Sequence, residues 1–171
     1  MWAALLIGLV ASGVAGIVNQ VIWQRALKIF LGGSETLSAM VVVLVFMAGL
    51  GLGAAVASRL AARSTDPLRA LAAVELGLAL GNTLVALILG LDITESVYAA
   101  QRMAVSVGVP LRVMYAVGCA ILLLPPTLAM GATLPLASEA TQRQLGASSR
   151  QLVPALLFVN TVGAALGAYG S

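Results

Sequence analysis

The sequence has 171 residues, of which 61% are hydrophobic and only 9% are charged. A water-soluble domain has about 45–50% apolar and about 25% charged residues, so this composition is typical of an integral membrane protein. At about 20 residues per spanning helix, the length allows four or five spans and no additional soluble domain. The net charge is +3 and the basic residues form no polybasic run, so we expect no nucleic acid partner.

The apolar segments predict an all-α fold, a polytopic membrane helix bundle of about five transmembrane helices in a single domain, 1–171. The first segment is apolar from its start and lacks a cleavage site, so we expect it to be retained. Between the third and fourth spans, apolar residues at near-helical spacing predict a short interfacial helix over 94–107. The spans are expected at 1–31, 35–62, 67–91, 111–144 and 151–170.

Basic residues in the connections give a weak indication of orientation. Five of them would lie on the side of the amino terminus: Arg59, Arg63, Arg69, Arg143 and Arg150. Four would lie on the opposite side: Arg25, Lys28, Arg102 and Arg112. Because basic residues are enriched in cytoplasmic loops, we expect an amino terminus in the cytoplasm and a location in the cytoplasmic (inner or plasma) membrane.

Residue types that hold metals and cofactors are scarce. The chain has no histidine, which is the commonest metal ligand and the usual axial ligand of haem. Its single cysteine, Cys119, lies in an apolar run and cannot form a disulfide or a cysteine-based metal site within one chain. We therefore expect no metal, no cofactor, no catalytic residue and no enzymatic activity.

Small residues recur at every fourth position on several predicted helices. Such ladders let helix backbones approach closely, which matters because lipid provides no hydrophobic drive for helix association. They predict tight packing, either inside one bundle or against a partner or a second copy. The ladders are Gly8, Ser12 and Gly16; Gly49, Gly53 and Ala57; Gly77 and Gly81; and Gly163 and Gly167.

Polar residues near the end of the first helix allow two interpretations. Gln20, Gln24 and Arg25 follow one another at helical spacing, with Trp23 between them. Arginine can reach the interface along its aliphatic stem, and tryptophan suits an interfacial belt, so an anchor at the helix end is one interpretation. A polar pathway lined by Gln20 and Gln24 is the other.

Glu75 lies in an otherwise apolar helix, eight residues after Pro67. An ionised carboxylate at membrane depth costs about 3 kcal/mol or more unless it is paired or wet, so it is a candidate functional residue. The alternative is a structural pair, for example with Arg59, Arg25 or a polar side chain of a neighbouring helix. Asn82 follows two turns later on nearly the same face, so both side chains are candidates for one cavity or one helix contact.

The fourth predicted span contains Pro125 and Pro126, followed by Thr127 and Pro135. Each proline withholds an amide proton and crowds the preceding turn, so we expect a kink or break near the middle of this helix. Interrupted helices often mark a midplane site in transporters. They are also found as plain kinks, which here would be satisfied by Thr127 and the neighbouring helices.

Three segments of the chain resemble a known family: 18–80, 122–136 and 158–168. The most specific parts are LPPTLAMGATLP (124–135) and NTVGAALG (160–167). They resemble the membrane domain of the spermidine synthase-like membrane proteins, in which a multi-helix region precedes an aminopropyltransferase domain. That membrane region is distantly similar to half of a major facilitator transporter, whose second and third helices are joined by a small-residue and arginine-bearing connection, here Gly49 to Arg69.

The resemblance implies a helical membrane fold and assigns no chemistry to individual residues. The family's soluble transferase domain, with its glycine-rich nucleotide-binding turn and acidic catalytic residues, has no counterpart in these 171 residues. We therefore do not expect aminopropyl transfer from this chain.

Three functions are compatible with the sequence. The first is a non-catalytic membrane subunit that packs through its small-residue faces into a larger respiratory or photosynthetic complex, with a structural or assembly role. The second is a homodimeric, half-size transporter that moves a small cation or polyamine past Glu75, Asn82, Gln20, Gln24 and the Pro125–Pro126 break. The third is the membrane part of a polyamine aminopropyltransferase system. We favour the first because it requires no residue that the chain lacks.

Overall fold

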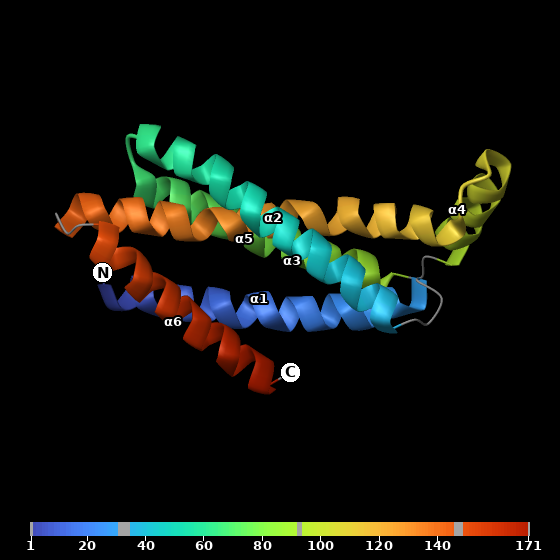
Figure 1. The fold of residues 1–171 in the computed structure, drawn as a ribbon, viewed down its shortest axis with the longest axis horizontal. Helices are drawn as coiled ribbons and strands as arrows, with labels where there is room; N and C mark the ends of the chain where they lie inside the picture. Colours follow the sequence, from blue (N-terminus) through green and yellow to red (C-terminus); the bar gives the residue numbers. More distant parts are fainter. Residues whose placement is uncertain (1, 31–34, 92–93, 146–148, 171) are drawn as a thin grey trace.

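The computed structural model describes residues 2–30, 35–91, 94–145 and 149–170, and their regular structure is entirely helical. The helices are α1 (Trp2–Phe30), α2 (Glu35–Arg63), α3 (Pro67–Gly90), α4 (Thr94–Val107), α5 (Leu111–Leu145) and α6 (Ser149–Gly170) (Figure 1). Apart from α4, all of these are long and apolar enough to cross a membrane. The prediction of a membrane helix bundle with about five spans is therefore confirmed, and the largest shift in a boundary is at α6, which begins at Ser149.

Local sequence signals explain where α3 begins and where α4 ends. The Asp66 carboxylate accepts a hydrogen bond from the amide of Arg69 at 3.1 Å, and Pro67 occupies the first turn of α3, where its missing amide proton costs nothing. At the other end of the bundle, Gly108 takes a left-handed conformation (φ +69°) directly after α4. This turn redirects the chain from α4, which lies across the end of the bundle, into α5 (Figure 1).

The closest helix crossing joins α2 and α5. A Cβ atom at Gly49 would collide with the Thr127 side chain, and one at Gly53 would collide with the carbonyl of Leu128. On the facing helix, a Cβ atom at Gly131 would lie 2.8 Å from the Cα atom of Leu50. Glycine is therefore required on both helices for this crossing.

A second close crossing joins α1 and α6. A Cβ atom at Gly163 would lie 2.9 Å from the carbonyl carbon of Val10, and one at Gly167 would lie 2.8 Å from the carbonyl oxygen of Val14. The Gly49–Gly53 and Gly163–Gly167 ladders therefore serve contacts inside the bundle. By contrast, a Cβ atom at Gly77 would have no neighbour within 4 Å, and one at Gly81 would lie 3.7 Å from the Cβ atom of Pro126, an ordinary contact.

Of the kink or break expected at Pro125 and Pro126, the break is not found, because α5 continues as one helix from Leu111 to Leu145, and the kink stays a prediction. Proline's fixed φ is compatible with a helix, so its cost lies in the lost hydrogen bond and local crowding. The Thr127 hydroxyl donates to the carbonyls of Leu123 and Leu124, both at 2.9 Å, within the same turn. Helix α2 also packs closely against this part of α5, where Gly49 and Gly53 contact Thr127 and Leu128.

Trp23 does not anchor the first helix at the interface. Its side chain is 2% exposed and packs in the main apolar core with residues of α2, α3 and α5, among them Val42, Leu78 and Leu123. Arg25 is exposed, as an anchor would be. The lipid-facing surface is formed by other residues, such as Leu76, Leu80 and Leu84 on the outer face of α3.

Candidate functional site: a cleft between α1 and α3

A cleft of about 600 Å³ lies between α1 and α3, with α5 contributing to its floor. It forms because the extensive contacts of the bundle join α1 to α6 and α3 to α5 and do not join α1 to α3. Its lining follows α3 from Leu68 to Asn82, which corresponds to about 21 Å at 1.5 Å per residue. The α1 wall consists mainly of small residues: Gly8, Ala11, Ser12 and Ala15.

Glu75 lies on the α3 wall of this cleft and is half-buried. It is eight residues from the start of α3, about 12 Å along the helix axis, and so lies well inside the span. No described residue gives its carboxylate a hydrogen bond or an ion pair. The predicted structural pair with Arg59 or Arg25 is therefore absent from the described part of the chain, which leaves an uncompensated acid at membrane depth.

Asn82 lines the same cleft two turns beyond Glu75, as the shared helix face predicted. Its side-chain oxygen is buried and receives no hydrogen bond within the described residues. A polar group that is withdrawn from water without a partner costs about 1–3 kcal/mol. One wall of the cleft thus carries a buried, unsatisfied carboxamide oxygen and a half-buried carboxylate without a partner among the described residues.

The other members of the predicted polar pathway lie outside this cleft. Gln20 and Gln24 are not among its lining residues. The Gln24 backbone carbonyl instead accepts a 2.6 Å hydrogen bond from the buried Ser38 hydroxyl, which joins α1 to α2. Pro125 and Pro126 are also absent from the cleft lining, so the structure combines only two of the predicted pathway residues in one site.

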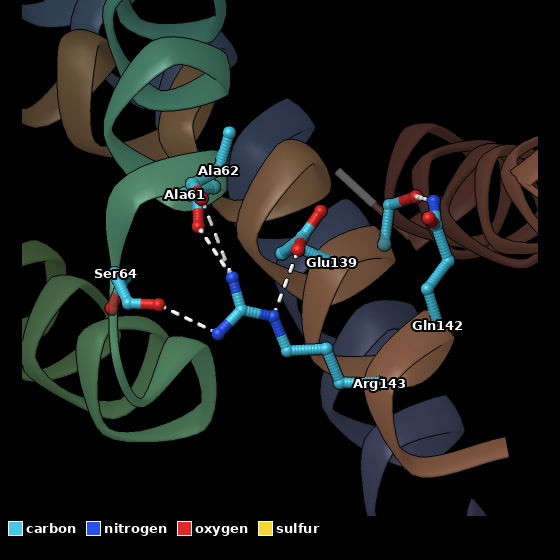
Figure 2. Close-up of polar contacts among 7 residues, drawn as sticks. Ala61, Ala62, Ser64, Glu139, Gln142 and Arg143 are labelled. Carbon is cyan, nitrogen blue, oxygen red and sulfur yellow. Dashed lines mark hydrogen bonds and ion pairs between the residues drawn. The ribbon is translucent and has the colours of Figure 1, made fainter. Parts of the chain in front are cut away.

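Sequence reasoning missed the role of Arg143 at the α2–α3 connection (Figure 2). Its Nε atom pairs with Glu139 at 2.9 Å, while its terminal nitrogens donate to the carbonyls of Ser64 at 2.6 Å and Ala61 at 3.4 Å. These carbonyls belong to the last turn of α2 and the connection after it, where backbone acceptors lack helical partners and a cation is favourable. The spacing of Glu139 and Arg143, four residues apart, was the available sequence signal.

Arg143→Ala should lower the free energy of unfolding by about 1–2 kcal/mol, because charged hydrogen bonds to carbonyls at the end of α2 are lost at a partly exposed site. Denaturant titration in mixed micelles, followed by circular dichroism, measures this loss. Arg69→Ala is the matched control, since Arg69 is 90% exposed in its ion pair with Asp66 and should change stability by less than about 0.5 kcal/mol. Equal losses in the two variants would contradict the assigned role of Arg143.

The chemistry that the α1–α3 cleft offers is acceptance of positive charge and hydrogen bonds. Its polar side chains are the Glu75 carboxylate, the Asn82 and Gln144 carboxamides and the Ser12 hydroxyl, in a largely apolar lining. Among the described residues, no three of His, Cys, Asp and Glu come together as a metal-binding group would. Comparison with known proteins adds no relative, because no family model, curated protein or solved structure matches the chain.

Proposed function

We propose that the chain is a non-catalytic integral membrane subunit with a structural or assembly role in a larger membrane complex of the respiratory or photosynthetic type. The observation that supports this role is the α1–α3 cleft, in which Glu75 and Asn82 lack partners among the described residues. Unsatisfied polar groups at membrane depth are costly in lipid, and a neighbouring protein can satisfy them. We place the chain in the inner or plasma membrane with its amino terminus in the cytoplasm.

Gentle detergent extraction from the native membrane, followed by native gel separation and mass spectrometry, tests this role. The expected result is stoichiometric migration of this chain with a large redox or light-harvesting complex. Migration as a single chain or as a homodimer would contradict it. Extraction in two detergents of different harshness provides the control, because a true subunit dissociates only in the harsher one.

Transport is the second candidate, and the size of the cleft favours it. A volume of about 600 Å³ lies within the range of small-molecule sites, and Glu75 would suit a cationic or polyamine ligand. Two observations count against transport. Gln20 and Gln24 lie outside the cleft, and α5 is unbroken, so these residues do not form one continuous pathway. Uptake of radiolabelled putrescine by proteoliposomes, compared between the native chain and Glu75→Gln, separates this candidate from the subunit role.

A further inference from the structure

The α1–α3 cleft has the form of a groove along the helix axes. Its α3 wall extends for about 21 Å, which corresponds to about four helical turns. Small side chains such as Ala11 and Ala15 form most of the α1 wall, and the α3 wall combines Ala72 and Ala79 with larger side chains. A groove with this length and lining allows the backbone of another helix to approach closely.

The charge in this groove identifies what such a helix must carry. Glu75 lies between Ala72 and Ala79 on the α3 wall, and no cation among the described residues pairs with it. The described ion pairs all lie near helix ends, where Lys28 pairs with Glu35 and Arg69 with Asp66. A carboxylate at membrane depth is costly unless it is paired or wet, and a helix that fills the groove and excludes water from it would have to supply a cation at the same depth.

Charge also argues against a second copy of this chain as the occupant. A two-fold symmetric dimer uses the same patch on both subunits. Pairing two α1–α3 clefts would place the Glu75 carboxylates of both copies in one apolar interface, where like charges repel. The occupant must therefore differ from the cleft in charge.

We propose that the α1–α3 cleft binds a transmembrane helix of a different membrane protein, and that this helix presents a lysine or arginine to Glu75. The inference rests on the subunit role proposed above and specifies the contact through which it operates. The Asn82 carboxamide, about 10 Å further along α3, supplies a second polar contact to the same helix.

Site-specific photocrosslinking in the native membrane tests the proposal. The photoreactive residue p-benzoylphenylalanine replaces Ala79, which lines the cleft one turn from Glu75, and the control position is Leu84, which is 57% exposed on α3 and is absent from the cleft lining. Mass spectrometry of the crosslinked peptide gives its sequence. The expected product at Ala79 is an apolar helix of another protein with a lysine or arginine near its centre, and this product should be absent at Leu84.

Glu75 variants test the charge separately from the groove. Glu75→Gln should lower the yield of the crosslinked product at least fivefold, whereas Glu75→Asp, which keeps the charge, should retain most of it. Crosslinks to lipid or to this chain, a crosslinked helix without a central cation, or an undiminished yield in Glu75→Gln would each overturn the proposal. If co-migration with a large complex persists in any of these cases, the subunit role stands without this contact; if the native chain migrates alone, both fail.

Discussion

Gly53→Leu should separate α2 from α5 and destabilise the whole bundle by about 3 kcal/mol or more, at or beyond the upper end of overpacking costs. The physical reason is that a Cβ atom at Gly53 would collide with the backbone carbonyl of Leu128, and a backbone cannot move aside as a side chain can. The α2–α5 contact is the most extensive in the bundle, so the helices cannot absorb the added volume locally. Thermal unfolding in detergent, followed by circular dichroism, measures the effect.

Gly51→Leu is the control, because it lies on the same helix with no atom within 4 Å of the Cβ position. It adds the same volume and the same change in helix propensity, but on an open face. We expect its unfolding temperature to remain within a few degrees of that of the native chain, since surface substitutions are usually worth less than about 0.5 kcal/mol. Equal destabilisation of the two variants would show that the α2–α5 crossing is not as close as described.

The second large effect is expected for Gly163→Leu, which should detach α6 from α1. A Cβ atom at Gly163 would meet the backbone of Val10, and α6 makes most of its contacts with α1. Because α6 contacts α5 much less, the damage should remain local. Hydrogen exchange followed by mass spectrometry should show α6 amides exchanging about tenfold faster or more, with little change in α2 and α5.

Ala165→Leu serves as the control for this result, because Ala165 is exposed and lies two residues from Gly163 on the same helix. In Ala165→Leu, the α6 amides should exchange at the same rate as in the native chain. Faster exchange throughout the bundle of Gly163→Leu would mean that α6 is part of the cooperative core, contrary to the contacts described here.

These variants also change how an assembly experiment must be interpreted. From the sequence, the Gly49–Gly53 ladder was compatible with either an internal contact or a partner interface. The structure places both glycines against Thr127 and Leu128 of α5, so a loss of assembly in Gly53→Leu would follow from misfolding. The α1–α3 cleft, where Glu75 can be changed to Gln with little change in volume, is the informative place to test assembly.

The number and approximate bounds of the helices could be predicted because a lipid-spanning helix needs an apolar run of nearly fixed length, and charges mark its ends. The start of α3 at Asp66 and Pro67 follows from the same local chemistry. Glu75 and Asn82 could be placed in one site because seven residues return to nearly the same face of a helix. Each of these predictions uses only the sequence of a single helix and its ends.

The remaining features depend on which helices meet, and helical periodicity contains no such information. Trp23 is apolar enough for a core and amphipathic enough for an interface, and only the packing of α1 against its neighbours decides between them. Pro125 and Pro126 lie inside α5 beside the residues that α2 crosses, a contact that the sequence of α5 alone does not reveal. Arg143 reaches carbonyls about 80 positions earlier in the chain, a contact that no local pattern predicts.

The length of α5 has a consequence for how the protein meets its surroundings. Its 35 residues extend for about 52 Å, whereas the hydrocarbon core of a bilayer is about 30 Å thick. Even a tilted α5 must continue into the headgroup layer or the water beyond it. The end that carries Glu139 and Arg143 is the polar one, so we expect this end of α5 to extend beyond the hydrocarbon core.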